Sequence, residues 1–499
     1  FSFFRGDTYK GKLIRMTHSV TEFTRFYNSP FSYWCNKTNK LVEEKRIDAK
    51  HKIDIDASKL ISKQLLAKAQ EHEVVLKDIY RISENLNVVD MSHKESTNQV
   101  FLKELDKNPD VIFQPQVSSK DFVGRLDFVN VVGDELHIID AKLSSSVKGV
   151  HIVQLCAYKE ILEIVTEKEV TECFLFLGDL QLHRVELGEY QKKYEELKNQ
   201  FVDFNNAYNP ELPPYPRKDE ELQEYESAAK KIWIQNNGLE LIHRIQNKQI
   251  EKFKKNKIKT IEDLKNTNLQ KIDGMGESTF LKYKKLAQLF NDSTENEILF
   301  EIKDSSLNGL HKPKKEDLYI DFEGYPFLKI GRNFEYLYGI WSIDEDENFT
   351  YYWSDDEEEE KKSFMSFMEY LLEHLKLYPK AKFYHYFSYE TTSLRKSAKT
   401  FGVYKEEIER LIEKECFVDL FKTINSSLLI GASSYSLKTV EKLAGINRTE
   451  NLQSGKESIQ YFEDYFYNEE YDLKDLIIEY NKADCKNLFL LHNWLAELL

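Results

Sequence analysis

The chain has 499 residues, of which 41% are hydrophobic and 31% are charged, and its formal net charge is −15. This length corresponds to about three domains, and the composition excludes collagen-like and broadly disordered proteins. The acidic balance argues against a protein that coats nucleic acid without specificity. It does not exclude a nuclease, because residues 251–290 hold ten lysines against five acidic residues and form a locally basic island.

The sequence shows no targeting or membrane signal. No stretch approaches about 18 uninterrupted apolar residues, so we expect no membrane-spanning helix. Arg5 and Asp7 break the apolar N-terminal run, no small-residue cleavage site follows, and Met16 is a candidate natural start. The five cysteines include no CxxC pair, which fits a reducing compartment, so we expect a cytoplasmic protein.

The first predicted domain covers residues 16–208 and has a mixed α/β pattern. The turn Gly133-Asp134 separates two β-rich runs, which is typical of a hairpin. The elements expected in chain order are helices near 21–29 and 56–80, strands within 111–119, 123–132 and 135–144, a helix near 149–165, a hairpin within 172–187 and a helix near 189–207. Four prolines between 209 and 217 cannot continue a helix and mark a domain boundary.

Two further regions follow this boundary. Residues 218–292 have a lysine-rich helical pattern, and a second α/β domain covers 316–499. The second domain opens with β-rich runs, which are followed by a helix near 358–377, a strand at 382–387 and mostly helical residues. The whole pattern predicts an α/β multidomain protein.

Carboxylates lie near the ends of two strands in the first domain. Asp140 and Lys142 alternate on one strand and share a face, and Asp127 joins that face if its strand pairs across the Gly-Asp turn. Clustered carboxylates repel each other, so a divalent cation is their natural neutraliser. A nearby ammonium can orient the attacking water and stabilise charge on a phosphate. On the preceding helix, the stretch Gln70-Glu71-His72-Glu73 offers an imidazole or a carboxylate as a further ligand.

The helix after the hairpin presents Gln154 and Tyr158 on one face, where both can reach a nucleic-acid backbone. Taken alone, D-x-K pairs are common at solvated strand edges, and His72 alone is more simply a surface or core histidine. The ordered set of helix His, strand Asp, D-x-K and helix Q-x-x-x-Y is more specific than any of its parts.

This order resembles the RecB-like branch of the PD-(D/E)xK nuclease superfamily, which implies a restriction-endonuclease-like fold. The stretches VIFQPQVSSKDFVGRLDFV, IIDAKL and HIVQLCAYKEIL are similar to a bacterial family of RecB-like nucleases with a C-terminal RNase H-like domain. By this resemblance, Mg²⁺ or Mn²⁺ is bound by His72, Asp127 and Asp140. Lys142 is the catalytic lysine, and Gln154 and Tyr158 are supporting contacts. Relatives often carry a cysteine cluster, but only Cys35 lies near the corresponding region here, so we expect no iron–sulfur cluster.

A second set of acids lies in the last domain. Asp321 and Glu323 alternate on one strand and share a face. Glu390 opens the helix after the strand at 382–387, and Tyr480 and Asp484 share a helix face. Four converging carboxylates would hold two divalent cations that clamp the attacking water and the leaving oxygen of a phosphodiester. The tyrosine hydroxyl would position that water.

A D-x-E pair alone is more simply a solvated strand edge, but the whole order looks like the DnaQ-like 3′–5′ exonucleases of the RNase H-like fold. HYFSYETTSLRK, FVDLFK and SYSLKTVEKLAG resemble the YprB-type domain over about 317–496. The resemblance implies a catalytic role for Tyr480, and both catalytic and metal-binding roles for Asp321, Glu323, Glu390 and Asp484. Glu390 stands where the superfamily usually has Asp, and His385 stands where it often has Asn. We expect His385 to contact nucleic acid and Asp419 to lie near the site.

The middle segment contains IDGMGESTF, which resembles a helix–hairpin–helix. Backbone amides of Gly274 to Gly276 would cradle a phosphate with help from Lys282. A plain connector between two helices explains the pattern equally well.

The leading interpretation is a metal-dependent nuclease that hydrolyses DNA phosphodiester bonds in repair or processing. It combines a 3′–5′ exonuclease for single strands or ends with a second, RecB-like site. Two alternatives stay open: a nucleic-acid-binding scaffold with one or both sites inactive, and an RNA-processing exonuclease. Relatives join this architecture to a helicase, so we expect a helicase partner in trans or a longer fusion.

Overall fold

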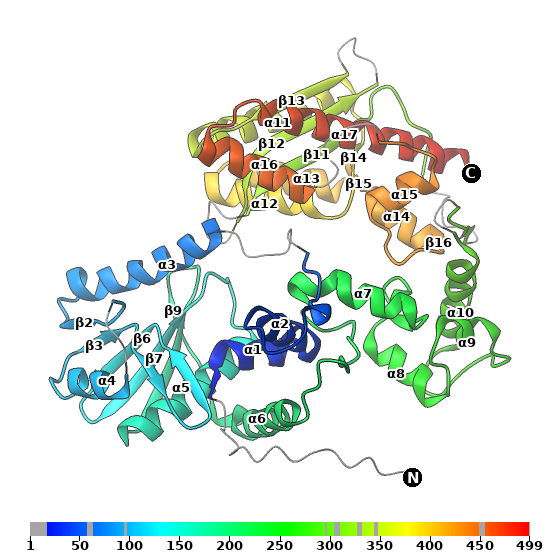
Figure 1. Cartoon of the computed structure of the whole chain (residues 1–499). Helices are drawn as coiled ribbons and strands as arrows, with labels where there is room; N and C mark the ends of the chain where they lie inside the picture. The colour runs from blue at the N-terminus through cyan, green and yellow to red at the C-terminus, as the bar shows by residue number, and fades with distance from the viewer. Residues whose placement is uncertain are drawn as a thin grey trace. The chain divides into compact units, whose positions relative to one another are not determined.

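The computed structural model describes residues 17–56, 63–93, 97–294, 297–303, 310–326, 332–343, 348–448 and 455–498 (Figure 1). The contacts divide the chain into two compact units. The first contains the residues up to Pro216 together with Glu220–Ala228, and the second contains Arg217–Asp219 and the residues from Ala229 onward. Both units are mixed α/β, as the sequence predicted.

The first unit is built on a six-stranded sheet with the strand order β2-β3-β6-β7-β8-β9. These strands are Val88–Asp90 (β2), Val111–Phe113 (β3), Phe128–Val132 (β6), Glu135–Ala141 (β7), Val170–Phe176 (β8) and Leu182–Arg184 (β9). The pair β6–β7 is antiparallel across the turn Gly133-Asp134, and β8–β9 is also antiparallel. Both predicted hairpins are therefore present. The pair β7–β8 is parallel and is joined by a helix.

A second, three-stranded sheet has the order β1-β5-β4. Its strands are His18–Ser19 (β1), Gln116–Ser118 (β4) and Phe122–Arg125 (β5). The single strand predicted within 123–132 is therefore two strands, β5 and β6, which belong to different sheets. Asp127 does not lie in a strand but in the bend between β5 and β6. The bend arises because β5 pairs with β4, whereas β6 pairs with β3 in the other sheet.

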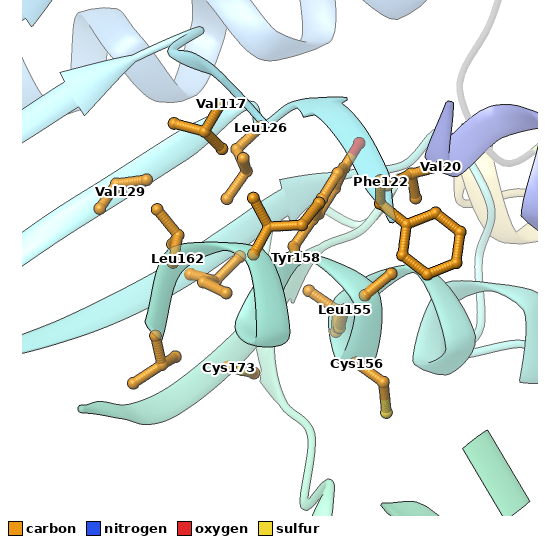
Figure 2. Close-up of a cluster of buried hydrophobic side chains, with 14 of the residues drawn as sticks. Val20, Val117, Phe122, Leu126, Val129, Leu155, Cys156, Tyr158, Leu162 and Cys173 are labelled. Atoms are coloured by element: carbon orange, nitrogen blue, oxygen red, sulfur yellow. The ribbon is translucent and has the colours of Figure 1, made fainter. Parts of the chain in front are cut away.

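The helices of the first unit cover its sheets. They are Val20–Asn28 (α1), Pro30–Glu43 (α2), Lys63–Asp78 (α3), Asn98–Leu105 (α4), Gly149–Thr166 (α5) and Gln191–Asn206 (α6). The start of the predicted helix at 56–80 lies partly outside the described residues. Helix α5 is apolar on most of its surface, which fits its place between the sheets and α6, and the side chains in Figure 2 gather around it.

The helical segment that the lysine-rich pattern predicted follows, and it belongs to the second unit from Ala229 onward. Its helices are Glu226–Gln235 (α7), Asn247–Lys255 (α8), Ile261–Asn266 (α9) and Glu277–Asp292 (α10). A two-stranded sheet follows, in which Phe300–Ile302 (β10) pairs with Leu428–Ile430 (β16). This pairing fixes the end of the helical segment to the rest of the unit.

A five-stranded sheet with the order β13-β12-β11-β14-β15 forms the centre of the second unit. Its strands are Leu318–Tyr325 (β11), Phe334–Ser342 (β12), Phe349–Trp353 (β13), Phe383–His385 (β14) and Phe417–Asp419 (β15). Its helices are Glu357–Leu377 (α11), Tyr389–Phe401 (α12), Lys405–Glu413 (α13), Leu420–Ser427 (α14), Leu437–Leu443 (α15), Gly455–Asn468 (α16) and Leu473–Glu497 (α17).

The two faces of β11 pack against different helices. Leu318, Ile320 and Phe322 belong to the core that contains α11 and α12. Tyr319 belongs to a separate core that includes Leu488 and Leu491 of α17. Because side chains alternate along a strand, Asp321 and Glu323 lie on the α17 side of the sheet. In the described part of the chain, no helix combines the length and the hydropathy needed to cross a bilayer.

Candidate active site and a second acidic cluster

Strand β11 and helix α17 bring three predicted acids together. One carboxylate oxygen each from Asp321, Glu323 and Asp484 lies within 4.8 Å of the others. No other group of three or more His, Cys, Asp or Glu side chains within the described residues is as close. The alternation of the strand and the i, i+4 spacing of Tyr480 and Asp484 thus place these side chains toward one another, as the sequence analysis expected.

A glycine allows α17 to approach the sheet so closely. Gly339 of β12 is the register partner of Asp321. A Cβ at this position would collide with the side-chain oxygen of Asn481 on α17. Asn481 in turn donates to the Asp321 backbone carbonyl at 3.1 Å and to its Oδ2 at 2.7 Å. The close approach therefore also orients the Asp321 carboxylate.

Burial and mutual repulsion raise the pKa values of the three carboxyl groups. Burial, followed by the charges of Asp484 and Glu323, raises the pKa of Asp321 well above its usual range. Burial and the charge of Asp484 raise the pKa of Glu323 to about 8. Burial also raises the pKa of Asp484 to about 6, although Arg448 opposes this shift. A hard divalent cation such as Mg²⁺ or Mn²⁺ prefers oxygen ligands and would remove this repulsion, so the donor set fits such an ion.

Arg448 is the cation of this site and was not identified from the sequence. Its Nη2 lies 2.5 Å from Asp484 Oδ1, and its Nε and Nη2 donate to Glu441 at 2.7 Å each. Glu441 is 1% exposed and also accepts from Asn487 at 3.0 Å. Within the described residues, the buried Nη1 of Arg448 has no hydrogen-bond partner. A guanidinium held in this way can offer its remaining N–H groups to a phosphate oxygen.

Tyr480 lies against the same cation. Its ring centroid is 5.7 Å from Cζ of Arg448. Burial and the charge of Asp484 raise the pKa of Tyr480, so its hydroxyl stays protonated, and its hydrogen bond with Asp484 lowers the pKa of that acid. The hydroxyl is therefore next to the acids, where the sequence analysis expected it.

Glu390 and His385 lie next to the three acids. Glu390 is buried and close enough for its charge to raise the pKa of Asp321, but it is not part of the three-acid group. Its Oε2 lies 3.1 Å from Nδ1 of His385. His385 is only 3% exposed but lines a cavity of about 500 Å³, so its contact with nucleic acid stays a prediction. Burial alone would lower the pKa of His385, but the hydrogen bond and charge of Glu390 raise it, so the two groups form a buried pair.

Asp419 has a structural position. Its side chain accepts from the backbone N–H of Lys422 as the N-cap of α14. It also accepts from the backbone N–H of Phe387 at 3.0 Å. The carboxylate therefore holds the loop after β14 next to the start of α14.

The comparison with protein families bears on this unit. Residues 318–496, which run from β11 to the end of α17, match the sequence model of the RNase H superfamily. The chain therefore carries a C-terminal RNase H-like domain. The comparison with curated proteins gives no match. RNase H-like nucleases usually use divalent metals, which agrees with the donor set of Asp321, Glu323 and Asp484 in the RNase H-like domain.

A second acidic cluster lies in the first unit. Lys142 Nζ lies 2.6 Å from Asp140 Oδ2, and the backbone N–H of Ala141 donates to Asp127 Oδ2 at 2.7 Å. Burial, followed by the charge of Asp140, raises the pKa of Asp127 well above its usual range. Burial alone would lower the pKa of Lys142, but the charges of Asp140 and Asp127 raise it. The two aspartates and the lysine therefore lie together, although Asp127 reaches the cluster from a bend and not from a strand.

Helix α3 also brings Glu73 to this cluster, a residue that the resemblance did not single out. The pKa of Glu73 is raised by burial and is also shifted by the charges of Lys142 and Asp140. His72 is 1% exposed, stacks on Phe176 and has Nε2 at 3.0 Å from the Phe176 carbonyl oxygen. His72 therefore packs beside the sheet, and its buried Nδ1 has no hydrogen-bond partner within the described residues, so its role as a ligand stays a prediction. The residues alone left an imidazole or a carboxylate of the stretch 70–73 open, and the resemblance pointed to the histidine.

Gln154 of α5 contacts this cluster, and Tyr158 of the same helix holds Gln154 in place. Gln154 Nε2 lies 3.3 Å from Asp140 Oδ1 and donates to the Tyr158 hydroxyl at 2.9 Å. The Tyr158 hydroxyl donates to the Arg125 carbonyl at 2.9 Å. Figure 2 shows the Tyr158 ring among apolar side chains that include Phe122 and Leu126. Tyr158 is 5% exposed, so the expectation that it reaches a nucleic-acid backbone does not fit, whereas its supporting contact with Gln154 does.

The glycine turn of the helical segment lies where the sequence placed it, between α9 and α10. Gly274 has a φ of +73°, which favours glycine, and its carbonyl accepts from Lys252. Gly276 is the N-cap residue of α10, and Lys282 is exposed on the same helix. The phosphate-binding role of this turn stays a prediction.

Proposed function

We propose that the RNase H-like domain is a metal-dependent 3′–5′ exonuclease that hydrolyses single-stranded DNA or single-stranded ends. The observation that carries this proposal is the convergence of Asp321, Glu323 and Asp484 within an RNase H-like fold. The raised pKa values of these three acids support it, because their mutual repulsion is removed only by a proton or a cation.

Each side chain of the site has a defined task in this proposal. Asp321, Glu323 and Asp484 hold Mg²⁺ or Mn²⁺, which supplies Lewis-acid chemistry for the attacking water and the leaving oxygen. Asn481 fixes the orientation of Asp321. The Tyr480 hydroxyl, which stays protonated, positions the attacking water by hydrogen bonding.

Arg448 acts on the substrate, and the pair of Glu390 and His385 acts on the surrounding structure. Arg448 offers its free Nη1 to the scissile phosphate and stabilises the charge that develops there. The buried pair of Glu390 and His385 lies beside the acids and fixes the start of α12.

We further propose that the acidic cluster of the first unit is a RecB-like nuclease site of the PD-(D/E)xK type. Asp127, Asp140 and Glu73 would hold the ion there, and Lys142 would act on the attacking water. The short contact between Lys142 and Asp140 supports this role, since it places the ammonium next to a carboxylate that would hold the ion. The proposed context is DNA repair or processing in the cytoplasm, with a helicase partner in trans. The main alternative is a binding scaffold whose sites are inactive, and an RNA substrate is the second.

The test compares the purified chain with two isosteric variants, Asp321→Asn and Asp140→Asn, and with their combination. The substrates are single strands of DNA or RNA of the same sequence, labelled at the 5′ or the 3′ end, in Mg²⁺ or Mn²⁺. We expect a ladder of shortened 5′-labelled products that disappears in Asp321→Asn. Glu479→Gln, an exposed acid on α17, is the matched control and should retain the ladder. If the parent chain and the double variant behave alike, the catalytic proposal fails and the scaffold alternative stands.

A further inference from the structure

A groove of about 950 Å³ crosses the second unit between the helical segment and the residues that follow β16. We call it the lysine groove. Its lining includes Ile234, Phe290, Lys438, Thr439 and Lys442. None of them belongs to the acid site described above.

The two walls of the lysine groove differ in chemistry. Helix α15 and the loop before it supply hydroxyl and ammonium groups, among them Thr439, Lys438 and Lys442. The helical segment supplies apolar side chains, among them Phe290 and Ile234, and Ile234 is 58% exposed. One wall therefore suits a chain of phosphates, and the other suits flat apolar groups.

The lysines of the groove are not used by the fold. Within the described residues, neither Lys438 nor Lys442 forms an ion pair or a side-chain hydrogen bond, and Lys442 is exposed. The two residues are spaced i, i+4 on α15, so their side chains lie on one helix face. Their positive charge is available to a ligand in the groove.

Helix α15 connects the groove with the acid site. Lys438 lines the groove, and Glu441, one turn further along the same helix, holds Arg448 against Asp484. The ammonium of Lys438 is close enough to Arg448 and Asp484 for both charges to shift its pKa, in addition to the lowering by burial. The charges of Glu457 and Glu441 also act on Lys438, so its ammonium lies close both to the groove and to the charged groups around Arg448.

The walls of the groove are held in a fixed relation by direct contacts. The rings of His243 and Tyr435 stack with their centroids 3.7 Å apart. Cζ of Arg244 lies 4.9 Å from the centroid of the Phe421 ring. The Gly431 N–H donates to the Leu299 carbonyl at 2.8 Å. The groove is therefore a preformed feature of the unit.

We propose that the lysine groove binds one nucleic-acid strand and leads it to the acid site, with its phosphates on Lys438 and Lys442 and its bases against Ile234 and Phe290. Proteins that bind single strands combine a basic track for the backbone with apolar or aromatic surfaces for the bases. A duplex would keep its bases paired and could not use the apolar wall. The proposal adds a substrate path to the proposed function, and it rests on that function only for the reaction at the end of the path.

The first experiment measures binding without turnover. The full-length Asp321→Asn chain is titrated with a 5′-fluorescein-labelled 20-nucleotide oligo-dT by fluorescence anisotropy at several NaCl concentrations. Lys438→Gln with Lys442→Gln should weaken binding about tenfold at low salt and reduce the salt slope by about 1.4, since each lost phosphate contact removes about 0.7 for single strands. Lys396→Gln with Lys399→Gln, two exposed lysines on α12, is the matched control and should change neither value by as much. Equal behaviour of the two pairs, or no binding of the oligonucleotide at all, would overturn the proposal.

The second experiment tests the apolar wall. Ile234→Ser removes apolar contact without changing charge, so we expect a two- to fivefold loss of affinity for the single strand with an unchanged salt slope. Affinity for the corresponding duplex should not change. If Ile234→Ser leaves single-strand binding intact, the bases do not lie on this wall and the proposed orientation is wrong.

A third measurement separates failure of the groove from failure of the proposed function. Thymidine 5′-(p-nitrophenyl phosphate) is too short to extend along the groove. The parent chain should hydrolyse it in Mn²⁺, and Lys442→Gln with Ile234→Ser should leave this rate unchanged while raising KM for the oligonucleotide. If the parent chain hydrolyses neither substrate, the proposed function is wrong. The groove is then accepted or rejected from the anisotropy titrations, which need no hydrolysis. Hydrolysis with an unchanged KM in the variant would contradict the groove.

Discussion

The two acidic clusters of this chain solve the same electrostatic problem in different ways. In the first unit, Lys142 contacts Asp140 at 2.6 Å, so the compensating ammonium belongs to the cluster itself. In the RNase H-like domain, Arg448 forms an ion pair with Asp484, while neither Asp321 nor Glu323 forms an ion pair within the described residues. The charge of the first cluster is thus partly neutralised by its own lysine. In the second cluster, the repulsion among the three carboxylates remains until a proton or a metal ion binds.

This difference has a consequence for metal binding. An ion at the first cluster must compete with Lys142 for Asp140, whereas an ion at the second meets three repelling carboxylates whose oxygens lie within 4.8 Å. We therefore expect the RNase H-like site to bind Mg²⁺ or Mn²⁺ more tightly. The distance between acids alone does not define a metal site, because a neighbouring side-chain cation already neutralises part of their charge.

The largest effect that would sharpen this comparison is loss of exonuclease activity. Asp321→Asn should lower the rate of 3′-end shortening by about a thousandfold, because it removes a ligand that acts throughout the reaction. Asp140→Asn should leave that ladder in place and remove only products made at the first unit. Single-turnover assays with 5′-labelled strands separate the two product patterns. Loss of the ladder in Asp140→Asn would show that the two clusters do not act independently.

Removing each compensating cation tests the comparison through stability. Arg448→Met leaves Glu441 and Asp484 buried without their cation, and we expect a loss of about 3–5 kcal/mol in the free energy of unfolding. Lys142→Met should cost less, because Asp140 keeps its contact with Gln154. Urea denaturation followed by circular dichroism measures both.

The double variant Arg448→Met with Glu441→Gln is the control for this prediction. It removes the buried charge together with its partner, so it should recover part of the stability lost in Arg448→Met. Equal destabilisation by Arg448→Met and Lys142→Met would show that the two cations are equivalent.

A third prediction concerns the effect of pH on stabilisation by metal. Burial and neighbouring charge raise the pKa of Glu323 from its usual 4.5 to about 8 and that of Asp484 from 3.8 to about 6. The folded protein therefore holds these protons more tightly than the unfolded chain, and without metal its stability falls as the pH rises through 6 and 8. Metal binding needs the ionised acids, so the increase in Tm caused by Mg²⁺ should grow from pH 6 to pH 8 by a few degrees.

Thermal denaturation in EDTA and in MgCl₂ across this pH range makes the measurement. Glu323→Gln carries no titrating group at this position and should flatten the dependence. A pH-independent effect of Mg²⁺ in the parent chain would contradict the assignment of these acids as ligands.

Regular patterns in the sequence predicted much of this structure. The alternation of Asp321 and Glu323, and the i, i+4 spacing of Tyr480 and Asp484, were sufficient to place these side chains on facing surfaces. The Gly133-Asp134 turn fixed the first hairpin. Such patterns succeed because the geometry of one strand or one helix determines which side chains share a face.

The features that sequence analysis missed depend on contacts between distant segments. Arg448 lies in an irregular stretch with no periodicity, and only the fold brings it to Asp484. His72 and Glu73 are adjacent on α3, where successive side chains point about 100° apart, so the pattern could not decide which of them faces the acids. The break at Asp127 arises because β5 and β6 pair in different sheets, and local β-propensity does not reveal a change of partner.

The smallest expected effect tests whether Tyr158 supports the first cluster or contacts nucleic acid. Tyr158→Phe keeps the ring in the apolar core of Figure 2 but removes the hydroxyl that joins Gln154 to the Arg125 carbonyl. We expect a loss of about 1–2 kcal/mol in the free energy of unfolding, because two partly buried polar groups each lose a partner, with no change in the Kd for single-stranded DNA. Tyr27→Phe, at a 41% exposed tyrosine on α1, is the matched control and should affect neither quantity. A weaker Kd at unchanged stability in Tyr158→Phe would instead favour a direct contact with the strand, and would mean that the first cluster is more open to its substrate than its buried support indicates.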